Sequence, residues 1–102
     1  MYFIKGRDAI ELLEEQRLIA QPSSVIIIAS ESDPTSWHGS LTIGKPLDDA
    51  LKQPLDIGSV LMIRFGCDGQ RFLGRVRITE APIDMGPFLW VEFGGVDVFQ
   101  LK

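Results

Sequence analysis

Three arginines are the residues whose type and spacing most clearly indicate binding chemistry. Arg64 follows an apolar run, and Arg75 and Arg77 occupy alternate positions further along the chain. A guanidinium group carries a planar fork of donors that matches a carboxylate or a phosphate. The sequence therefore predicts a surface that recognises anionic groups, to which Trp37 and Trp90 would add contact area.

No catalytic set of residues can be identified. Ser36 and His38 are close in sequence, but no Ser/His/Asp set with a recognisable spacing is present. Asp48, Asp49 and Asp56 could form a carboxylate pair, although nothing in the sequence favours it. We therefore predict that the protein is not an enzyme and has no catalytic residue.

Metals and cofactors have no recognisable ligand pattern either. His38 is not accompanied by other ligands at metal-binding spacing. Gly94-Gly95 lacks the lysine and the third glycine of a phosphate-binding loop. Cys67 is the single cysteine, which excludes an internal disulfide and is typical of a reducing compartment. We expect no metal, no cofactor and a cytoplasmic location.

Composition predicts one globular domain over residues 1–102. The chain is 45% hydrophobic and 24% charged, as ordinary folded domains are. The formal net charge of −4 argues against binding of a nucleic acid polymer. No apolar run reaches the length of a membrane span.

A β-hairpin must position the arginines. Residues 60–65 and 71–79 read as strands, joined by a turn at Cys67–Gln70 in which Asp68-Gly69 supplies the special backbone angles. In this register one face carries the apolar pairs Phe65–Phe72, Ile63–Gly74 and Leu61–Val76. The opposite face carries the pairs Arg64–Leu73, Met62–Arg75 and Val60–Arg77.

Two interpretations fit this second, mixed face. The arginine stems could lie over a helix or strand packed on it, with the charged ends reaching water. Alternatively, the face is an exposed recognition surface. Both place the arginines on the side of the hairpin away from the core.

The remaining segments are predicted from local signals. Asp8 and Glu11 resemble a capping box, which predicts a helix over residues 9–20. The β-branched run 25–29 indicates a strand buried on both sides or central in a barrel. A polar loop over residues 30–40 carries Trp37, either as a recognition residue or as a lid over the open end of a barrel.

Short strands follow at 41–43, 88–93 and 96–101, with a helical turn at 46–51 and a turn-rich link at 80–87. In the strand at 88–93, Leu89, Val91 and Phe93 would face the core. Gly94-Gly95 is typical of a hairpin turn. The fold class is therefore mainly β (α+β), a small antiparallel β-barrel or split barrel of six or seven strands with one N-terminal helix.

Several segments resemble the PilZ superfamily of cyclic di-GMP receptors. The likeness is to the barrel domain that precedes PilZ in flagellar brake (YcgR-like) proteins, and it involves residues 8–13, 55–61, 68–76 and 98–102. The PilZ nucleotide signature is an arginine pair followed by Asp-x-Ser-x-x-Gly. Residues 33–39 are one residue too long for it, and no suitable arginine pair precedes them, so the ligand residues do not carry over.

The resemblance implies a bacterial regulatory adaptor that binds protein partners or modulates a neighbouring domain. We therefore predict a non-catalytic interaction module with Arg64, Arg75, Arg77, Trp37 and Trp90 at its binding surface. A receptor for a small anion or a cyclic dinucleotide is the first alternative. A structural subunit of a homo-oligomer, with the apolar part of the mixed face buried, is the second.

Overall fold

The computed structural model describes residues 2–6, 8–29, 32–33, 36–45, 55–67 and 69–96. These residues form one antiparallel sheet of nine strands. The strands are β1 (Tyr2–Gly6), β2 (Asp8–Glu14), β3 (Arg17–Ala20), β4 (Ser24–Ala29), β5 (Trp37–Gly44), β6 (Val60–Cys67), β7 (Gln70–Ile78), β8 (Ile83–Asp84) and β9 (Phe88–Gly95).

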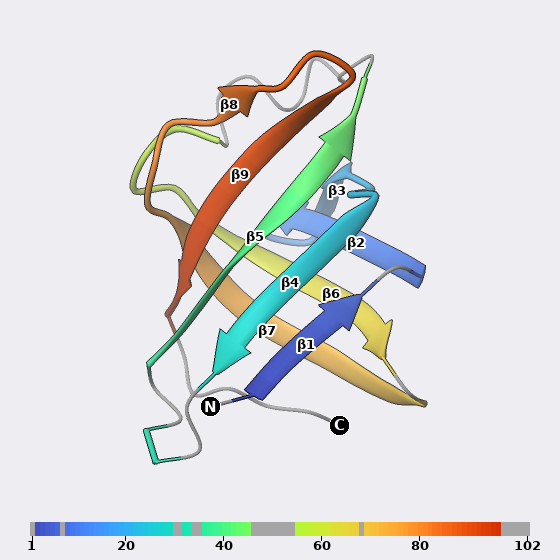
Figure 1. Cartoon of the computed structure of the whole chain (residues 1–102), viewed down its shortest axis with the longest axis vertical. Coiled ribbons are helices and arrows are strands. Elements are labelled where there is room, and N and C mark those ends of the chain that lie inside the picture. Colours follow the sequence, from blue (N-terminus) through green and yellow to red (C-terminus); the bar gives the residue numbers. More distant parts are fainter. Residues whose placement is uncertain are drawn as a thin grey trace.

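The sheet curls into a half-barrel (Figure 1). Its strand order is β1-β4-β5-β9-β7-β6-β2-β3, and β8 pairs with β9 beside this path. The curl brings β1, at one end of the sheet, close to β6 in the other half, because a Cβ added to Gly6 of β1 would lie 2.5 Å from Phe65 Cδ2 of β6. The predicted mainly β, barrel-like fold is thus confirmed at that level, with more strands than the six or seven expected.

The β6–β7 hairpin has the register predicted from the sequence. Phe65 pairs with Phe72, Ile63 with Gly74 and Leu61 with Val76. On the other face, the pairs are Arg64–Leu73, Met62–Arg75 and Val60–Arg77. The pairing of Cys67 with Gln70 leaves two residues at the tip, and Gly69 has a φ of 78°, a left-handed conformation that glycine adopts without strain.

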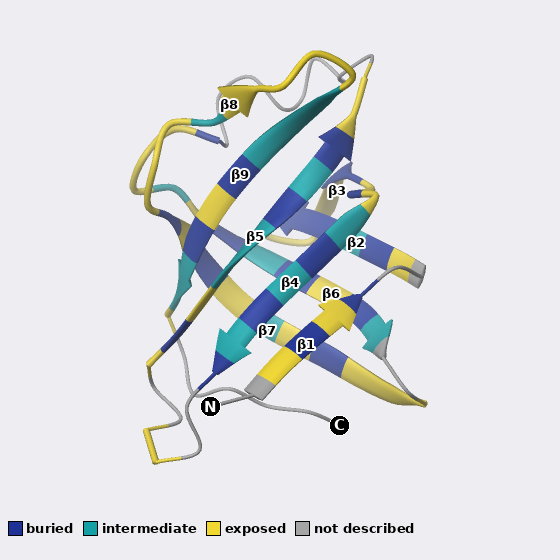
Figure 2. Ribbon diagram, viewed as in Figure 1, coloured by how far each residue is buried: buried dark blue, intermediate teal, exposed yellow. Residues whose placement is uncertain are grey.

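Side chains from the concave side of the half-barrel make the core. Along β4, β7 and β9, buried residues alternate with more exposed ones, so the strands appear striped in Figure 2. Among the described residues the core contains only apolar side chains, and no polar or charged residue is buried. Val91 and Phe93 face the core as predicted, and the half-buried Leu89 packs against it.

The predicted N-terminal helix is wrong. Residues 8–20 form β2 and β3, connected by a tight turn in which Glu15 has a φ of 59°. Ile10 and Leu12 are both buried and lie two positions apart, which is the period of a strand. Glu11 pairs with Arg64 of β6 instead of capping a helix, so cross-strand pairing overrides the local helix signal.

Two further local predictions are corrected around Trp37. This residue begins β5 and is 3% exposed, so it is part of the core and not of a polar loop. Gly94-Gly95 does not form a turn but continues β9, pairing with His38 of β5 and Val76 of β7. The helical turn predicted at 46–51 lies outside the described residues, as does most of the strand predicted at 96–101.

The indole of Trp37 explains why glycine occupies position 95. A Cβ at Gly95 would lie 2.0 Å from Trp37 Cε2, and the same indole makes edge contacts with Phe72 and Phe93 at centroid distances of 5.5 and 6.5 Å. The ring is therefore held against residues of both β7 and β9. Close packing of this kind tolerates no added methyl group.

We expect Gly95→Ala to destabilise the protein by about 1–3 kcal/mol, the usual effect of overpacking a core. Gly44→Ala is the matched control, because a Cβ there meets no atom within 4 Å, and it should change stability by less than about 0.5 kcal/mol. Urea unfolding of both variants measures the difference. Equal stability of the two variants would show that the core around the indole can accept a methyl group, which would contradict the tight packing at Gly95.

Candidate functional site

The outer face of the β6–β7 hairpin brings the predicted arginines together. Arg64 lies on β6, and Arg75 and Arg77 lie on β7, all on the convex side and all exposed. Val60 pairs with Arg77 and Leu73 pairs with Arg64, and these two apolar side chains are 41% and 39% exposed. Within the described part of the chain, no helix or strand covers this face. The structure therefore favours the exposed surface over the covered one.

Arg71 is a further cation that the sequence argument missed. It precedes the buried Phe72 on β7, so it shares the outer face with Leu73, Arg75 and Arg77. The alternation that placed Arg75 and Arg77 already contained the signal, because Arg71 has the same parity. We use "arginine face" below for Arg64, Arg71, Arg75 and Arg77.

Spacing along β7 turns this face into a row of charges. Outward-facing residues of a strand are about 7 Å apart, so Arg71 to Arg77 span about 20 Å. The row combines guanidinium groups with the half-exposed hydrocarbon of Leu73. Such a surface can offer ion pairs and apolar contact to the same ligand.

Glu11 of β2 partly neutralises the arginine face at one end. Its Oε1 accepts a hydrogen bond from Arg64 Nε at 2.7 Å. This bond lowers the pKa of Glu11, with a smaller contribution from the positive charges of Arg64 and Arg71, and it raises the pKa of Arg64. Arg77, at the opposite end, has no ion-pair partner among the described residues. The Glu11–Arg64 bond therefore lies away from Arg77, at the far end of β7.

The two predicted tryptophans do not belong to this surface. Trp37 is buried on the concave side, where it fills the core and cannot touch a partner. Trp90 is half-buried on the outer face of β9 and donates a hydrogen bond from Nε1 to Glu92 Oε1 at 3.3 Å. It lies four residues along β9 from Gly94, which pairs with Arg77. That separation is roughly 13 Å, so Trp90 belongs to a neighbouring region.

Catalytic and metal chemistry gain no support from the described residues. His38 is exposed on β5, Ser36 precedes the strand, and Asp48 and Asp49 lie outside the described ranges. Within those ranges, no three His, Cys, Asp or Glu residues gather closely enough to hold a metal ion. The described segments also contain no helix of the length and apolarity needed to cross a bilayer.

Comparisons with known proteins identify the fold alone. No family model matches the chain, and no curated protein matches it. A solved structure of a hypothetical protein from Staphylococcus aureus superimposes on the whole of this chain and on 73% of its own, with a TM-score of 0.70 and 18% sequence identity. At this identity the similarity shows a shared architecture and leaves the PilZ resemblance as a prediction.

The Glu11–Arg64 bond predicts how stability responds to acid. Folding lowers the pKa of Glu11 below its ordinary 4.5, so the bond stabilises the protein above that pH and is lost as pH falls through the lowered value. We expect Glu11→Gln to lower Tm slightly at neutral pH and to leave Tm less sensitive to pH below about 5. Thermal unfolding across pH measures both effects.

Glu80→Gln is the control, because Glu80 is exposed and has no ion-pair partner in the described residues. It removes the same charge without removing the bond. Identical pH profiles for the two variants would contradict a specific contribution from Glu11.

Proposed function

We propose that this domain is a non-catalytic protein-interaction module that binds an acidic protein segment on the arginine face. The observation that carries the proposal is the row of exposed guanidinium groups on one side of the β6–β7 hairpin. Guanidinium groups bind carboxylates through charge-assisted hydrogen bonds. Leu73 and Val60 supply apolar contact beside them.

The spacing of the row favours an extended partner. Alternate side chains of an extended peptide are about 7 Å apart, the same interval as the outward residues of β7. A peptide with an acidic residue at every second position could therefore meet several arginines at once. The net charge of −4 disfavours a long nucleic acid, because the rest of the surface repels a polyanion.

A regulatory role follows if the PilZ resemblance is correct. In that case the arginine face would report to a neighbouring domain or to a partner protein in cyclic di-GMP signalling. The support is the similarity of residues 8–13, 55–61 and 68–76 to the flagellar brake barrel. The absence of the nucleotide signature from residues 33–39 favours partner binding over direct capture of the nucleotide.

A small-anion receptor is the second candidate, because the arginine face contains a hollow. This cavity has a volume of about 240 Å³ and is lined by Arg64, Arg71, Phe72 and Leu73. A separate cavity of about 270 Å³ lies away from the arginine face. Two guanidinium groups beside the half-exposed Leu73 suit a single phosphate or carboxylate. Isothermal titration with cyclic di-GMP tests the nucleotide version, and the absence of heat at high micromolar nucleotide removes it.

We expect Arg75→Gln/Arg77→Gln to weaken binding of an acidic peptide in which glutamate and threonine alternate. Each exposed ion pair contributes about 0.2–1 kcal/mol, so the dissociation constant should rise about two- to thirtyfold. A peptide of the same composition with its glutamates grouped should bind the unmodified protein more weakly. Fluorescence anisotropy of labelled peptides at low and high salt measures these affinities.

Arg17→Gln/Lys45→Gln is the matched control, since it removes two exposed cations that lie off the arginine face. It should leave peptide affinity nearly unchanged. Arg71→Gln/Arg77→Gln repeats the test with a different pair of arginines. If Tm falls sharply in the arginine-face variants while peptide affinity persists, these side chains are structural and the proposal fails.

Homo-oligomerisation remains the rival explanation for the exposed apolar side chains Val60 and Leu73. Light scattering over a range of concentrations separates it from a monomeric adaptor. A constant monomer mass excludes the oligomer, whereas a mass that rises with concentration would assign this face to contact between copies.

A further inference from the structure

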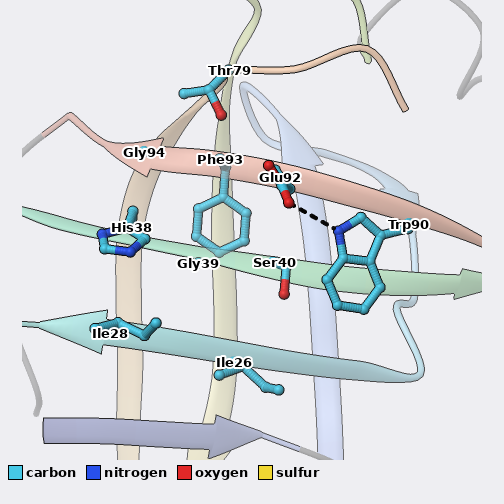
Figure 3. A pocket seen from close by; sticks show the side chains of 10 residues that line it. All are labelled: Ile26, Ile28, His38, Gly39, Ser40, Thr79, Trp90, Glu92, Phe93 and Gly94. Carbon is cyan, nitrogen blue, oxygen red and sulfur yellow. Dashed lines mark hydrogen bonds between the residues drawn. The ribbon is translucent and has the colours of Figure 1, made fainter. Parts of the chain in front are cut away.

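A second hollow lies on the outer face, across β4, β5 and β9, and it has a different character. Its volume is about 270 Å³. Ile26 and Ile28 of β4 form an apolar side, while Trp90 and Glu92 of β9 form the opposite side (Figure 3). We call it the Trp90 groove. The arginine face contributes no lining residue to it.

Negative charge distinguishes the Trp90 groove. Glu92 is the one carboxylate among the described residues that line it, and it is exposed. In the described part of the chain, the Glu92 side chain bonds only to the Trp90 indole, at 3.3 Å, and to no cation. The other polar lining side chains are the hydroxyls of Ser40 and Thr79 and the imidazole of His38.

The aromatic ring and the carboxylate stand side by side. Figure 3 shows the Trp90 indole lying across β5 next to Ser40, with Glu92 at its nitrogen edge. A cation that binds Glu92 therefore lies at the nitrogen edge of the indole, where the carboxylate supplies the negative charge and the ring supplies apolar contact beside it. The isoleucines on the far side offer a place for hydrocarbon attached to that cation.

Size restricts the ligand to a small group. Sites for drug-sized ligands are about 300–1,000 Å³, and the Trp90 groove lies just below this range. It suits one alkyl chain with a charged end. Gly94 adds to the opening, because its missing side chain leaves free space with only Thr79 Cγ2 nearby, 3.5 Å from an added Cβ.

We propose that the Trp90 groove binds an alkylammonium group, with the ammonium beside Glu92 and Trp90 and the alkyl chain against Ile26 and Ile28. The same chemistry belongs to a free aliphatic amine and to the lysine side chain of a partner protein. The site is independent of the proposed acidic-segment binding, since it has the opposite charge and different residues.

The two tryptophans provide a built-in assay. The indole N–H of Trp90 lies in the groove, whereas Trp37 is 3% exposed in the core and serves as the internal reference. Titration with n-butylammonium, followed by proton–nitrogen correlation NMR, should shift the Trp90 indole signal saturably and leave that of Trp37 in place. Trp90→Phe assigns the signals.

A ligand this small should bind with a dissociation constant in the millimolar range. n-Butanol and butyrate, at the same pH and ionic strength, are the matched probes without the positive charge. They should shift the Trp90 signal at least tenfold less at equal concentration. Equal shifts with butanol, or no saturable shift with butylammonium, would overturn the proposal.

Glu92→Gln should weaken butylammonium binding about tenfold while keeping the shape of the groove and an oxygen acceptor for the indole. Glu80→Gln is the control, because it is exposed, changes the net charge equally and does not line the groove. Unaltered affinity in Glu92→Gln would refute the role of the carboxylate. Gly94→Val, which fills the opening, should also weaken binding.

A blocked lysine, N-acetyl-lysine N-methylamide, distinguishes the two sources. Tighter binding of this probe than of butylammonium supports a lysine presented by a partner, because the added contacts come from peptide backbone. Weaker binding supports a free amine. Failure of both probes refutes the ammonium site without affecting the arginine-face proposal, which rests on acidic peptides.

Discussion

The half-barrel depends on how one indole is accommodated between three strands. Trp37 projects from β5 onto Phe72 of β7 and Phe93 of β9, and it lies over backbone where a side chain would collide. Added Cβ atoms at Gly95 and Gly74 would lie 2.0 and 3.1 Å from the ring. Because the glycines let β7 and β9 approach the ring, the sheet can bend around it. Strand alternation then leaves the arginine face and the Trp90 groove on the opposite, convex side of the sheet.

Sequence reasoning placed the register of the β6–β7 hairpin to the residue, and the reason is local. A long alternating pattern and the Asp68-Gly69 turn specify the same register, and a slip by one residue would exchange the buried and exposed faces. In the N-terminal segment, the local sequence signal and the observed strand pairing do not agree. Asp8 and Glu11 carry a helix signal, but the pairing of Glu11 with Arg64 involves residues far apart in the chain, which a local pattern does not contain.

The candidate sites also differ in how far local sequence patterns predict them. Arg64, Arg75 and Arg77 share a face because strand alternation puts them there, and the same rule would have added Arg71. Trp37 was predicted in a loop because its neighbours in sequence are polar. Its strand, β5, forms through pairing with β4, where Ala29 is the partner of Trp37, and with β9 on the other side. The Trp90 groove joins side chains from three strands, so only the folded sheet brings Ile26 and Glu92 together.

The position of β9 has a consequence for folding on the ribosome. This strand is the last of the described strands in sequence, yet it lies between β5 and β7 in the sheet. During synthesis, the group β1-β4-β5 and the group β7-β6-β2-β3 are complete before the strand that hydrogen-bonds them together has emerged. During that interval β5 and β7 each present an unpaired strand edge. The half-barrel is completed only when β9 pairs with both, through contacts of long sequence separation that form slowly. Nascent chains are therefore most exposed to aggregation just before Phe88–Gly95 leaves the exit tunnel.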